Sequence, residues 1–488
     1  MSDTTGTLPP PTSVHPPRPP AAKAPDRAPV DRTPPRPLAA VLAAVGIPMF
    51  MVTLDNLVVT NALPVIRTEL GASLRDLQWF VNAYTLSFAA LLLTASALGD
   101  RVGRRRVFVA GIAVFTLASA ACALATDPAL LVAARIVQGF GGAAVMPLSL
   151  TLLSDAVPER LRSAAIGIWG GIAGLGVALG PLLGGAVVDG LSWQWIFWVN
   201  VPIGMLVLPL VLWALRDSRG GGGRLDPLGL VLASAGVLAL VWGIVHGADD
   251  GWTSRGVLVA SAGGAALLAA LIAWEHRASA PMLAPRLFRI RAFSVANLVA
   301  FAFSLGVFGS IFLLAQFFQV AQGYSPLESG IRTMPWTMAP MVVAPLAGLV
   351  IDRIGARVLL VTGQALLAIA LAWIAAVTAV DLDYGSFVAP LLLAGIGMGL
   401  TFAPLATVVM AAVPETDRAM ASGTNNTVRE VGVAMGIAVL ASVFASHGTY
   451  TDPHGYVDGL VPAVWVGSAI VAAGALIAAL LPGRTRRN

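Results

Sequence analysis

From residue 38 almost to its end, the chain alternates between long apolar runs and short polar breaks. A run of about 20 apolar residues, folded as a helix, crosses the roughly 30 Å hydrocarbon core of a membrane. Fourteen runs reach that length, so the pattern predicts an all-α integral membrane protein with 14 transmembrane helices. Their expected limits are 38–62, 77–98, 106–126, 129–153, 162–188, 195–215, 226–246, 256–276, 293–318, 330–351, 358–380, 386–410, 420–446 and 460–481.

Arginine is concentrated in every second break between the runs. Sixteen arginines lie in one set of loops, which begins with "GDRVGRRR" at 99–106, and four lie in the alternate set. Basic loops stay on the cytoplasmic side of a membrane. We therefore predict that the arginine-rich loops and both termini are cytoplasmic, which agrees with an even number of spans.

Composition supports a membrane protein, because 57% of the 488 residues are hydrophobic and only 11% are charged. Soluble domains carry about 25% charged residues. The net charge of +5 comes from loop arginines, so we expect no nucleic-acid partner. One cysteine, five scattered histidines and one lysine indicate no disulfide, no metal site and no P-loop. With no catalytic Ser, His or Cys constellation visible, we expect neither an enzyme nor a cofactor.

An internal repeat and a proline-rich tail organise the chain beyond its helices. Residues 1–37 contain twelve prolines and no apolar run, which is typical of a disordered tail. "LGDRVGRRRVFVAG" at 98–111 recurs in degraded form as "VIDRIGARVLLVTG" at 350–363. Two related halves favour a transporter whose halves move about a central site. Chance similarity of two arginine loops is the alternative.

The repeat implies five parts. We expect a cytoplasmic tail over 1–37, a six-helix bundle over 38–215, and two inserted helices with a linker over 216–292. A second six-helix bundle over 293–481 and a short cytoplasmic tail over 482–488 would follow. The sequence does not indicate what the two inserted helices do.

Asp55 is the residue that the apolar pattern explains least. It stands beside Asn56 in "FMVTLDNLVVTNALP" at 50–64, within a run long enough to span the membrane. A charged side chain at that depth costs at least ~2.5–3.5 kcal/mol, so it normally faces the protein interior and has a function. Arg135 is a candidate partner because it also lies inside an apolar run. Snorkelling of Arg135 to the membrane surface is the alternative.

Two patterns of helical spacing stand out within the apolar runs. In "ARIVQGFGGAAVM", helical spacing places five residues on one stripe, namely Arg135, Gln138, Gly139, Gly142 and Met146. In "GIAGLGVALGPLLGG", a glycine at every fourth position lets another helix approach, and a proline favours a kink. These residues are Gly176, Gly180, Gly184 and Pro181. Plain glycine packing and a gate or seal both fit the second pattern.

The loop "GDRVGRRR" contains an acid, which weakens a positive-inside signal and needs another explanation. Asp100 beside Arg101 and Arg104 indicates a charge network, and Gly103 permits the tight turn. We interpret the loop as a latch that holds two bundles together in one conformation. The second copy of the repeat supplies Asp352, Arg353 and Arg357.

These motifs resemble those of the major facilitator superfamily, and within it the fourteen-span bacterial drug:proton antiporters. "LGDRVGRRR" is similar to the loop signature after the second span, "RIVQGFGGA" to the fourth-span motif, and "GVALGPLLGG" to the antiporter motif of the fifth span. "LDNLVVTNALP" is similar to the first-span motif of the fourteen-span group. The resemblance covers the chain from residue 38 onward. Ser96 and Glu430 depart from the family, which more often has glycine and glutamine there.

The resemblance implies a proton-driven antiporter that exports amphiphilic drugs or antibiotics across the bacterial cytoplasmic membrane and confers resistance. It implies that Asp55 binds the proton and that Arg135 tunes it, while Glu430 would add a second titratable group. The latch would stabilise the outward-facing state, and the antiporter motif would prevent uncoupled leak. We expect a monomer whose partners are the drug, protons and the lipid bilayer.

The sequence does not identify the substrate. Methionine and aromatic side chains provide adaptable surfaces for varied amphiphiles. Candidates for the cavity wall are Asn56, Tyr84, Gln138, Met146, Phe312, Gln316 and Trp336. The cavity has few acids, which argues against a strictly dicationic substrate. Export of one endogenous metabolite or siderophore by the same fold is the alternative function, and a membrane enzyme or receptor is disfavoured.

Overall fold

The computed structural model describes Ser2 and residues 37–219, 226–278, 285–414 and 418–482. The chain divides into a unit of Met1–Arg36 and a unit of Pro37–Asn488, and the fold lies in the second unit. Almost all of the expected N-terminal tail, and most of the C-terminal one, lies outside the described residues.

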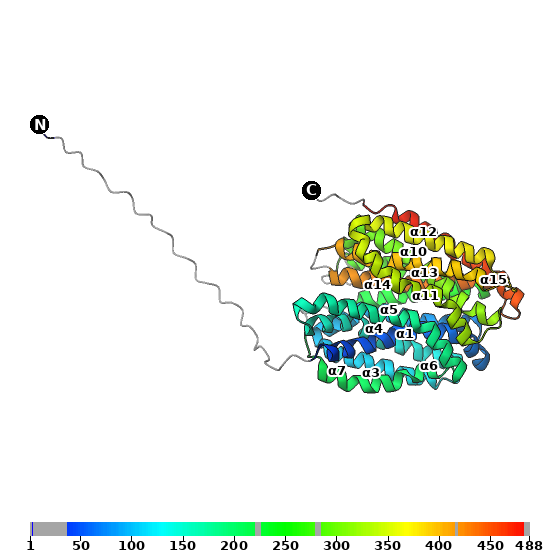
Figure 1. The fold of residues 1–488 in the computed structure, drawn as a ribbon, viewed down its shortest axis with the longest axis horizontal. Helices are drawn as coiled ribbons and strands as arrows, with labels where there is room; N and C mark the ends of the chain where they lie inside the picture. The colour runs from blue at the N-terminus through cyan, green and yellow to red at the C-terminus, as the bar shows by residue number, and fades with distance from the viewer. Residues whose placement is uncertain (1, 3–36, 220–225, 279–284, 415–417, 483–488) are drawn as a thin grey trace. The chain divides into compact units, whose positions relative to one another are not determined.

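The described part of the second unit is built from α-helices and one short 3-10 helix joined by short loops (Figure 1). The helices are α1 (Leu38–Leu70), α2 (Leu74–Val102), α3 (Arg104–Ala123), α4 (Pro128–Ala156), α5 (Glu159–Gly190), α6 (Trp195–Trp198), α7 (Asn200–Ala214), α8 (Pro227–Asp250), α9 (Arg255–Glu275), η1 (Pro285–Arg289), α10 (Arg291–Val320), α11 (Pro326–Ile354), α12 (Ala356–Val377), α13 (Gly385–Ala411), α14 (Arg418–His447) and α15 (Pro453–Ala478).

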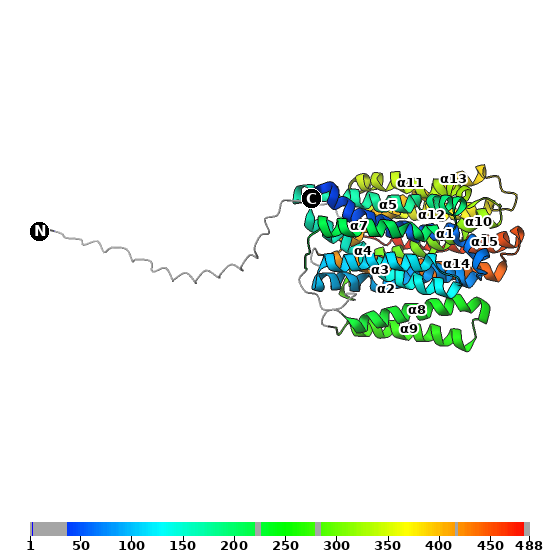
Figure 2. The same cartoon turned by 90° about the horizontal axis from the view of Figure 1, so that it is seen from below.

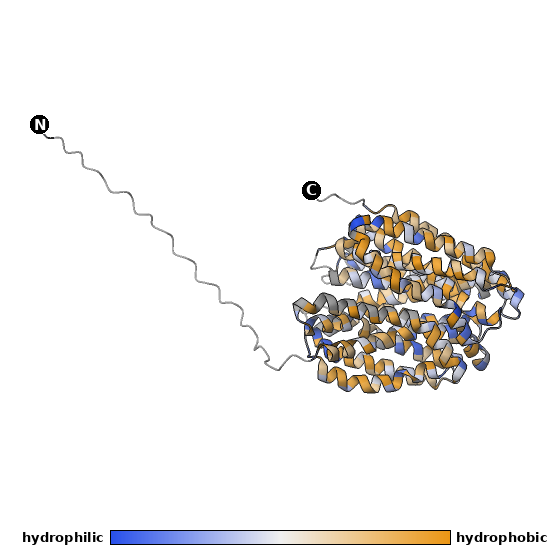
Figure 3. Ribbon diagram, in the orientation of Figure 1, coloured by the Kyte–Doolittle hydropathy of each residue, from blue (hydrophilic) through white to orange (hydrophobic). Residues whose placement is uncertain are grey.

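Among the described residues, twelve helical segments are long and apolar enough to cross a membrane, with α6 and α7 counted as one. The helices α2 and α5, of 29 and 32 residues, complete a set of fourteen. The predicted all-α membrane fold is therefore confirmed. Apolar residues dominate the ribbon in Figure 3, and outward leucines such as Leu206 and Leu349 are 75% and 76% exposed. Surfaces of this kind are stable in lipid rather than in water.

Polar residues at the loops set where the helices begin and end. Ser73 and Ser325 each form a capping box with the acid three residues later, at the starts of α2 and α11. The helix α1 continues eight residues beyond its expected limit of residue 62, to Leu70, where Gly71 adopts a φ of +62° and ends it. The expected limit lies just before Pro64, which the helix contains, and before the polar stretch of Arg67, Thr68 and Glu69 in its last turns.

The loops alternate between two ends of the unit. The arginine-rich end carries Gly103, between α2 and α3, and the opposite end carries Gly71, between α1 and α2. Gly103 has a φ of +130°, a conformation that strongly favours glycine, so the family-like loop signature has a structural reason for this residue.

The helices pack in two sets that meet along a few seams. In the first set, α1 packs on α5, and α4 packs on both α2 and α3. In the second set, α10 packs on α14 and α15, and α13 packs on α11 and α12. Between the sets, α5 packs on α11 (Figure 1), α2 on α14, and α1 on α10.

The inserted helices α8 and α9 form a hairpin at the side of the two sets (Figure 2). The helix α8 packs against both α2 and α14, so it contacts one helix from each set. The buried part of the contact is aliphatic, with Val241 and Val245 of α8 against Leu86 of α2 and Ala434 and Ala438 of α14. The hairpin therefore covers the α2–α14 seam.

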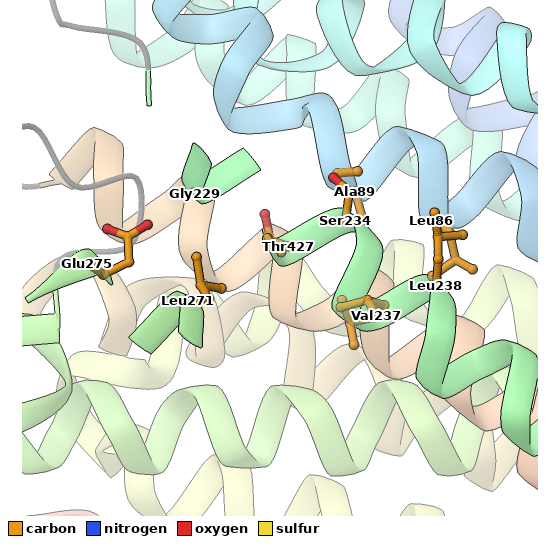
Figure 4. A pocket seen from close by; sticks show the side chains of 12 residues that line it. Leu86, Ala89, Gly229, Ser234, Val237, Leu238, Leu271, Glu275 and Thr427 are labelled. Atoms are coloured by element: carbon orange, nitrogen blue, oxygen red, sulfur yellow. The ribbon is translucent and has the colours of Figure 1, made fainter. Parts of the chain in front are cut away.

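A small pocket lies under the hairpin, between α2, α8, α9 and α14 (Figure 4). Its walls are mainly apolar, and Ser234, Glu275 and Thr427 contribute polar groups. The cavity measures about 40 Å³, whereas drug-sized ligands occupy pockets of about 300–1,000 Å³. We interpret it as a packing gap and not as a drug site.

The α5–α11 seam generates a first prediction. A Cβ at Gly330 of α11 would lie 2.5 Å from the Pro181 carbonyl oxygen of α5, whereas a Cβ at Gly348 of the same helix would meet nothing within 4 Å. We expect Gly330→Ala to destabilise the protein by about 1–3 kcal/mol through overpacking. Gly348→Ala should be neutral or stabilising by up to ~1 kcal/mol. Thermal unfolding in detergent checks both, and equal effects would contradict the close packing.

Candidate functional site

Asp55 of α1 and Arg135 of α4 form an ion pair in the interior of the first helix set. The Arg135 Nη1 atom lies 2.5 Å from Asp55 Oδ2, and both side chains are fully buried. The predicted contact between these two residues is therefore present. Arg135 does not reach the surface, which excludes the snorkelling alternative.

Neutral donors complete the hydrogen bonding of the Asp55 carboxylate. Its Oδ1 atom accepts from Gln138 Nε2 at 2.9 Å and from Asn200 Nδ2 at 3.0 Å. Gln138 also donates to Ser119 Oγ at 2.8 Å and accepts from Arg135 Nη1 at 2.7 Å. The carboxylate is thus held by α4 and α7 as well as by the ion pair.

The arginine is fixed by backbone and aromatic groups. Arg135 Nε donates to the Phe80 carbonyl oxygen at 3.0 Å, and its guanidinium lies 4.3 Å from the centroid of the Tyr84 ring. Phe197 lies on the guanidinium at 5.8 Å. Aromatic faces stabilise a desolvated cation, so α2 and α6 contribute to the same cluster.

Stability alone does not account for this cluster. Removing two charges from water costs several kcal/mol per ion, and well-packed apolar residues of similar volume often stabilise a protein as well or better. A buried, ionisable pair inside a membrane protein instead indicates an ion or proton pathway. The Asp55–Arg135 pair is therefore the candidate functional centre.

The glycine face of α5 packs against the part of α1 that carries Asp55. A Cβ at Gly176 would lie 3.0 Å from the Thr53 Cβ, and one at Gly180 would lie 2.8 Å from the Leu57 Cβ. A Cβ at the next glycine, Gly184, would lie 2.7 Å from the Val58 carbonyl oxygen of α1. The glycine spacing thus permits backbone contact with α1, as predicted, while a role in preventing leak stays a prediction.

Pro181 contributes its carbonyl group to the same seam. Asn61 Nδ2 of α1 donates to the Pro181 carbonyl oxygen at 2.7 Å. Proline inside a helix disturbs the backbone hydrogen bonds of the preceding turn, and a buried amide from α1 engages the chain at this point. The antiporter-like motif is therefore tied to α1 by a hydrogen bond as well as by packing.

The loop between α2 and α3 makes ion pairs with nearby segments. Arg104 Nη1 lies 2.7 Å from Asp155 Oδ2 at the end of α4, and Arg106 Nε lies 3.1 Å from Asp217 Oδ2 after α7. A Cβ at Gly103 would lie 2.6 Å from that same Asp217 carboxylate. These partners belong to the first set or to the segment after it, so the latch between bundles stays a prediction.

The remaining latch residues and one cavity residue are described incompletely. Arg101, Arg353 and Arg357 are exposed at the arginine-rich end. The side chains of Asp100, Asp352 and Asn56 lie outside the described residues.

Glu430 lies in α14, within the second set, and its side chain is 7% exposed. Its neighbour Arg429 donates to Asn426 Oδ1 at 3.3 Å and lies 5.1 Å from the centroid of the Phe402 ring. Glu430 is one turn from Ala434, which packs near α2 and α8. Glu430 is therefore a second buried acid. It lies on α14, which packs against α2, whereas Asp55 lies on α1.

The predicted cavity residues fall in different surroundings. Tyr84 and Gln138 contact the Asp55–Arg135 pair, and Met146 is half-buried in α4. Gln316, whose side chain bonds to the Phe312 carbonyl oxygen, is buried in α10. Trp336 lines a pocket of about 40 Å³ formed by α1, α5, α10, α11 and α13, at the junction of the two sets.

Three side-chain contacts close the junction towards the end opposite the arginine-rich loops. Gln319 Nε2 donates to the Asn61 carbonyl oxygen at 2.8 Å, and Ser325 Oγ donates to Asp189 Oδ2 at 3.3 Å. The Arg67 guanidinium lies 4.5 Å from the centroid of the Tyr450 ring, which belongs to the loop between α14 and α15.

The tyrosine of this contact remains a neutral donor. Burial raises the pKa of Tyr450, so its phenol stays protonated at physiological pH. Its hydroxyl donates to Gln316 Oε1 at 3.0 Å. The Arg67 contact is thus anchored to α10 of the second set.

Sequence reasoning missed several residues that complete these contacts. Asn200 and Ser119 join the Asp55 cluster, and Gln319 and Tyr450 join the two sets. Asn200 had a signal, because it is an isolated amide within the apolar run "WIFWVNVPIG". Tyr450 lies in a loop and had no such signal.

Comparison with known proteins agrees with this fold and these motifs. The sequence profile described as Major Facilitator Superfamily matches residues 45–437 and 296–488. The chain belongs to the major facilitator superfamily.

Within the superfamily, the chain falls in the fourteen-helix group that includes drug and antibiotic resistance exporters. It is 39% identical over 417 residues to the multidrug resistance protein Stp of Mycobacterium tuberculosis, covering 85% of this chain and 77% of Stp. It is 40% identical over 410 residues to the cephamycin export protein CmcT of Amycolatopsis lactamdurans, covering 83% and 84%. It is 34% identical over 427 residues to the tetracenomycin C resistance and export protein of Streptomyces glaucescens, covering 87% and 79%.

Solved structures of the superfamily share the fold. A bacterial homolog of the human lysosomal transporter Spinster, in an inward-facing and unoccupied conformation, superposes with a TM-score of 0.66 at 19% identity, covering 91% of this chain and 96% of that one. The POT family transporter PepTSo superposes with a TM-score of 0.66 at 14% identity, covering 91% and 97%. The chain is therefore a multi-pass membrane transporter and not an enzyme.

The buried ion pair generates a second prediction. Arg135→Leu leaves the Asp55 carboxylate without its counter-ion and should destabilise the protein by about 3–5 kcal/mol. The double variant Asp55→Leu with Arg135→Leu removes both charges and should be more stable than the single variant. Thermal unfolding of the parent, of Arg135→Leu and Asp55→Leu alone, and of the double variant measures the coupling energy between the two residues. Strictly additive effects would show that the two residues do not stabilise each other.

Proposed function

We propose that this transporter is a proton-driven antiporter that exports amphiphilic drugs or antibiotics by alternating access. The observation that carries the proposal is the fully buried Asp55–Arg135 pair, held by the neutral donors Gln138 and Asn200. It is supported by the resistance and export functions that the names of the relatives state.

Protonation of Asp55 would change the forces within the first set. Once neutral, the carboxyl group no longer balances the Arg135 charge, and one of its oxygens becomes a donor. The donors Gln138 and Asn200 would then face a changed partner, which favours a different arrangement of α1, α4 and α7. Binding of one proton to Asp55 would therefore directly favour a conformational change in the helices that hold this residue.

Close packing extends this route to the second set. Asp55 lies on α1 between residues that touch the glycine face of α5, and α5 packs on α11. Backbones in contact move together more readily than backbones separated by flexible side chains. We infer that a shift of α1 reaches the α5–α11 seam through Gly180, Gly184 and Gly330.

The energy of one proton is sufficient for export. One charge that moves down 100 mV yields ~2.3 kcal/mol, and each pH unit adds ~1.36 kcal/mol. Together these support a drug gradient on the order of 10²–10³ across the membrane.

We infer that the arginine-rich end is cytoplasmic, because basic loops stay on that side. The contacts of Asn61 with Gln319, of Ser325 with Asp189 and of Arg67 with Tyr450 would then close the external side. Export requires this closure to open while the latch of Asp100, Arg101, Arg104, Asp352, Arg353 and Arg357 closes the cytoplasmic side.

Export of one endogenous antibiotic is the second candidate function. It is favoured by the relatives named as a cephamycin export protein and a tetracenomycin C resistance and export protein. A narrow substrate range in an efflux panel would support it over multidrug export.

A transport experiment tests the proposed function. Asp55→Asn keeps the shape of the side chain but cannot exchange a proton, so proton-driven export into inverted membrane vesicles should be lost. Asp250→Asn is the matched control, because Asp250 is exposed and pairs with Arg75 at 3.2 Å. Dye and antibiotic transport is followed with and without a protonophore. Uphill transport by Asp55→Asn that the protonophore still abolishes would move the coupling role elsewhere, with Glu430 as the next candidate.

Alternating access makes a further prediction at the closed end. With Cys122, the one native cysteine, replaced by serine, a disulfide between Asp189→Cys and Ser325→Cys would join α5 to the start of α11. Oxidation should stop transport and reduction should restore it. Either single-cysteine variant is the control, and full activity with the disulfide formed would contradict opening at this seam.

A further inference from the structure

The segment after α7 covers the start of α3 at the arginine-rich end of the first helix set. Asp217 accepts from the backbone N–H of Arg105 at 3.2 Å and pairs with Arg106 at 3.1 Å. The carbonyl oxygen of Ser218 accepts from the backbone N–H of Arg104 at 2.8 Å. A carboxylate and a carbonyl group therefore hold the first copy of the repeated loop in place.

Matching glycine contacts show which residues of the second set occupy the same places. A Cβ at Gly111 of α3 would lie 3.0 Å from the Gly141 carbonyl oxygen of α4. A Cβ at Gly363 of α12 would lie 2.9 Å from the Gly397 carbonyl oxygen of α13. The pair α12 and α13 therefore corresponds to the pair α3 and α4, in the register that the repeat gives.

The second set replaces the polar clamp by uncharged residues. The helix α7 packs on α3 and ends at Ala214, and α15 packs on α12 and ends at Ala478, so the residues after α15 correspond to those after α7. The register pairs five clamp residues with uncharged ones, namely Arg104 with Ala356, Arg106 with Val358, Asp155 with Ala411, Asp217 with Leu481 and Ser218 with Pro482. Arg105 alone has a charged counterpart, which is Arg357.

An open groove of about 820 Å³ lies at these positions of the second set. Its lining includes all six counterparts, namely Ala356, Arg357, Val358, Ala411, Leu481 and Pro482. A Cβ at Gly103 would lie 2.6 Å from the Asp217 carboxylate, whereas a Cβ at Gly355 would meet nothing within 4 Å. Drug-sized ligands occupy pockets of about 300–1,000 Å³, so the groove has room for a small molecule.

The lining of the groove combines one cation with an apolar wall. Arg357 is the one charged side chain among the described residues that line it. The Thr407 hydroxyl donates to the Ala403 carbonyl oxygen of its own helix at 3.0 Å. Aliphatic side chains such as Ile351 and Val408 form much of the remaining wall. The groove therefore suits an apolar molecule that carries a single negative charge.

The start of α12 adds hydrogen-bond donors beside Arg357. The helix begins at Ala356 without a side-chain cap. The backbone N–H groups of Ala356 and Arg357 correspond to those that Ser218 and Asp217 cover in the first set, and they have no acceptor within the part of the chain that the structure describes. Helix N-termini favour anions. The first set places a carboxylate at this point, which indicates the same group for a ligand of the second.

The groove lies where helices end and not along their lipid-facing length. Its lining residues belong to the first turns of α10 and α12, to the last turns of α11 and α13, or to the two residues Leu481 and Pro482 after α15. A small amphiphile can reach such a place from the aqueous phase. A bilayer lipid would have to lift its acyl chain out of the hydrocarbon core, which is unfavourable.

We propose that this groove binds an amphiphile that has one carboxylate and an apolar body and that enters from the aqueous phase at the arginine-rich end. The carboxylate would contact Arg357 and the start of α12, as Asp217 contacts the start of α3. The apolar body would lie against α13 and the residues after α15. The ligand would then hold the second copy of the repeated loop as Asp217 holds the first. This site goes beyond the proposed export function and lies in the set that does not contain Asp55.

Protection of an introduced thiol from alkylation tests the proposal on the full chain in phosphatidylcholine nanodiscs. In a Cys122→Ser background, Ala411→Cys places a thiol in the groove, and His276→Cys places an exposed control thiol at the same end. The probes are decanoate, decanol and decyltrimethylammonium, which share one tail. We expect decanoate to slow alkylation of Ala411→Cys by about threefold or more, as for a site that is mostly occupied.

The control thiol at His276→Cys should react at the same rate with and without decanoate. The neutral and cationic probes should protect neither thiol. Equal protection of Ala411→Cys by decyltrimethylammonium would overturn the carboxylate assignment. Absence of protection by decanoate at any concentration that leaves the nanodiscs intact would overturn the site.

Charge variants locate the carboxylate of the ligand. Arg357→Gln should abolish protection by decanoate, and Arg357→Lys should retain most of it because lysine keeps the charge. Ile354→Asp adds a negative charge to the exposed wall of the groove and should also abolish protection. Arg289→Gln is the control, because Arg289 is exposed at the same end and does not line the groove. Full protection in Arg357→Gln, or equal losses in Arg357→Gln and Arg289→Gln, would contradict the proposal.

A lipid in the groove would give a different result. Phosphatidylglycerol in the nanodisc would then slow alkylation of Ala411→Cys without any probe, and decanoate would add no protection, which would overturn the aqueous source. The assay needs neither a proton gradient nor a transported drug. Its outcome is therefore independent of the proposed proton coupling at Asp55.

Discussion

The arrangement of the first helix set depends on one buried ion pair. Asp55 and Arg135 are removed from water, so each needs the other and their remaining polar atoms favour partners, although Arg135 Nη2 has no hydrogen-bond partner among the described residues. That requirement explains why two amides, a hydroxyl and an aromatic face converge from α2, α3, α4 and α7 on one point of α1. A change in the charge of the pair is therefore felt by most of the set.

Small residues determine how such a change is passed on. The glycines of α5 bring its backbone against α1 on one face, and Gly185 and Gly330 bring α5 against α11 on another. The helix α5 is thus packed closely on both helix sets. A stiff helix in this position transmits displacement, whereas long flexible side chains would absorb it.

The sequence predicted the fold well because hydropathy and arginine placement are direct consequences of the bilayer. It also predicted the Asp55–Arg135 contact, since two opposite charges buried in apolar runs have few other solutions. It could not predict the contacts of Asn61, Gln319 and Tyr450, which depend on how the two sets meet. Tyr84 and Gln138, which the sequence places among the candidates for a substrate cavity, lie beside the Asp55–Arg135 pair, and their part in a cavity stays a prediction.

The hairpin of α8 and α9 has a mechanical consequence. Its buried contacts with α2 and α14 are mainly between aliphatic side chains, and an exposed ion pair, Arg75 with Asp250, joins α2 to the end of α8. Dispersion forces are weak for each atom pair and have no preferred direction, and exposed ion pairs contribute little. Small shifts between aliphatic surfaces break no oriented bond, so resistance to them would come mainly from groups such as the Arg75–Asp250 pair. If the two sets turn against each other during transport, as we propose, a helix that contacts both in this way would cover the seam while offering little resistance to the rotation.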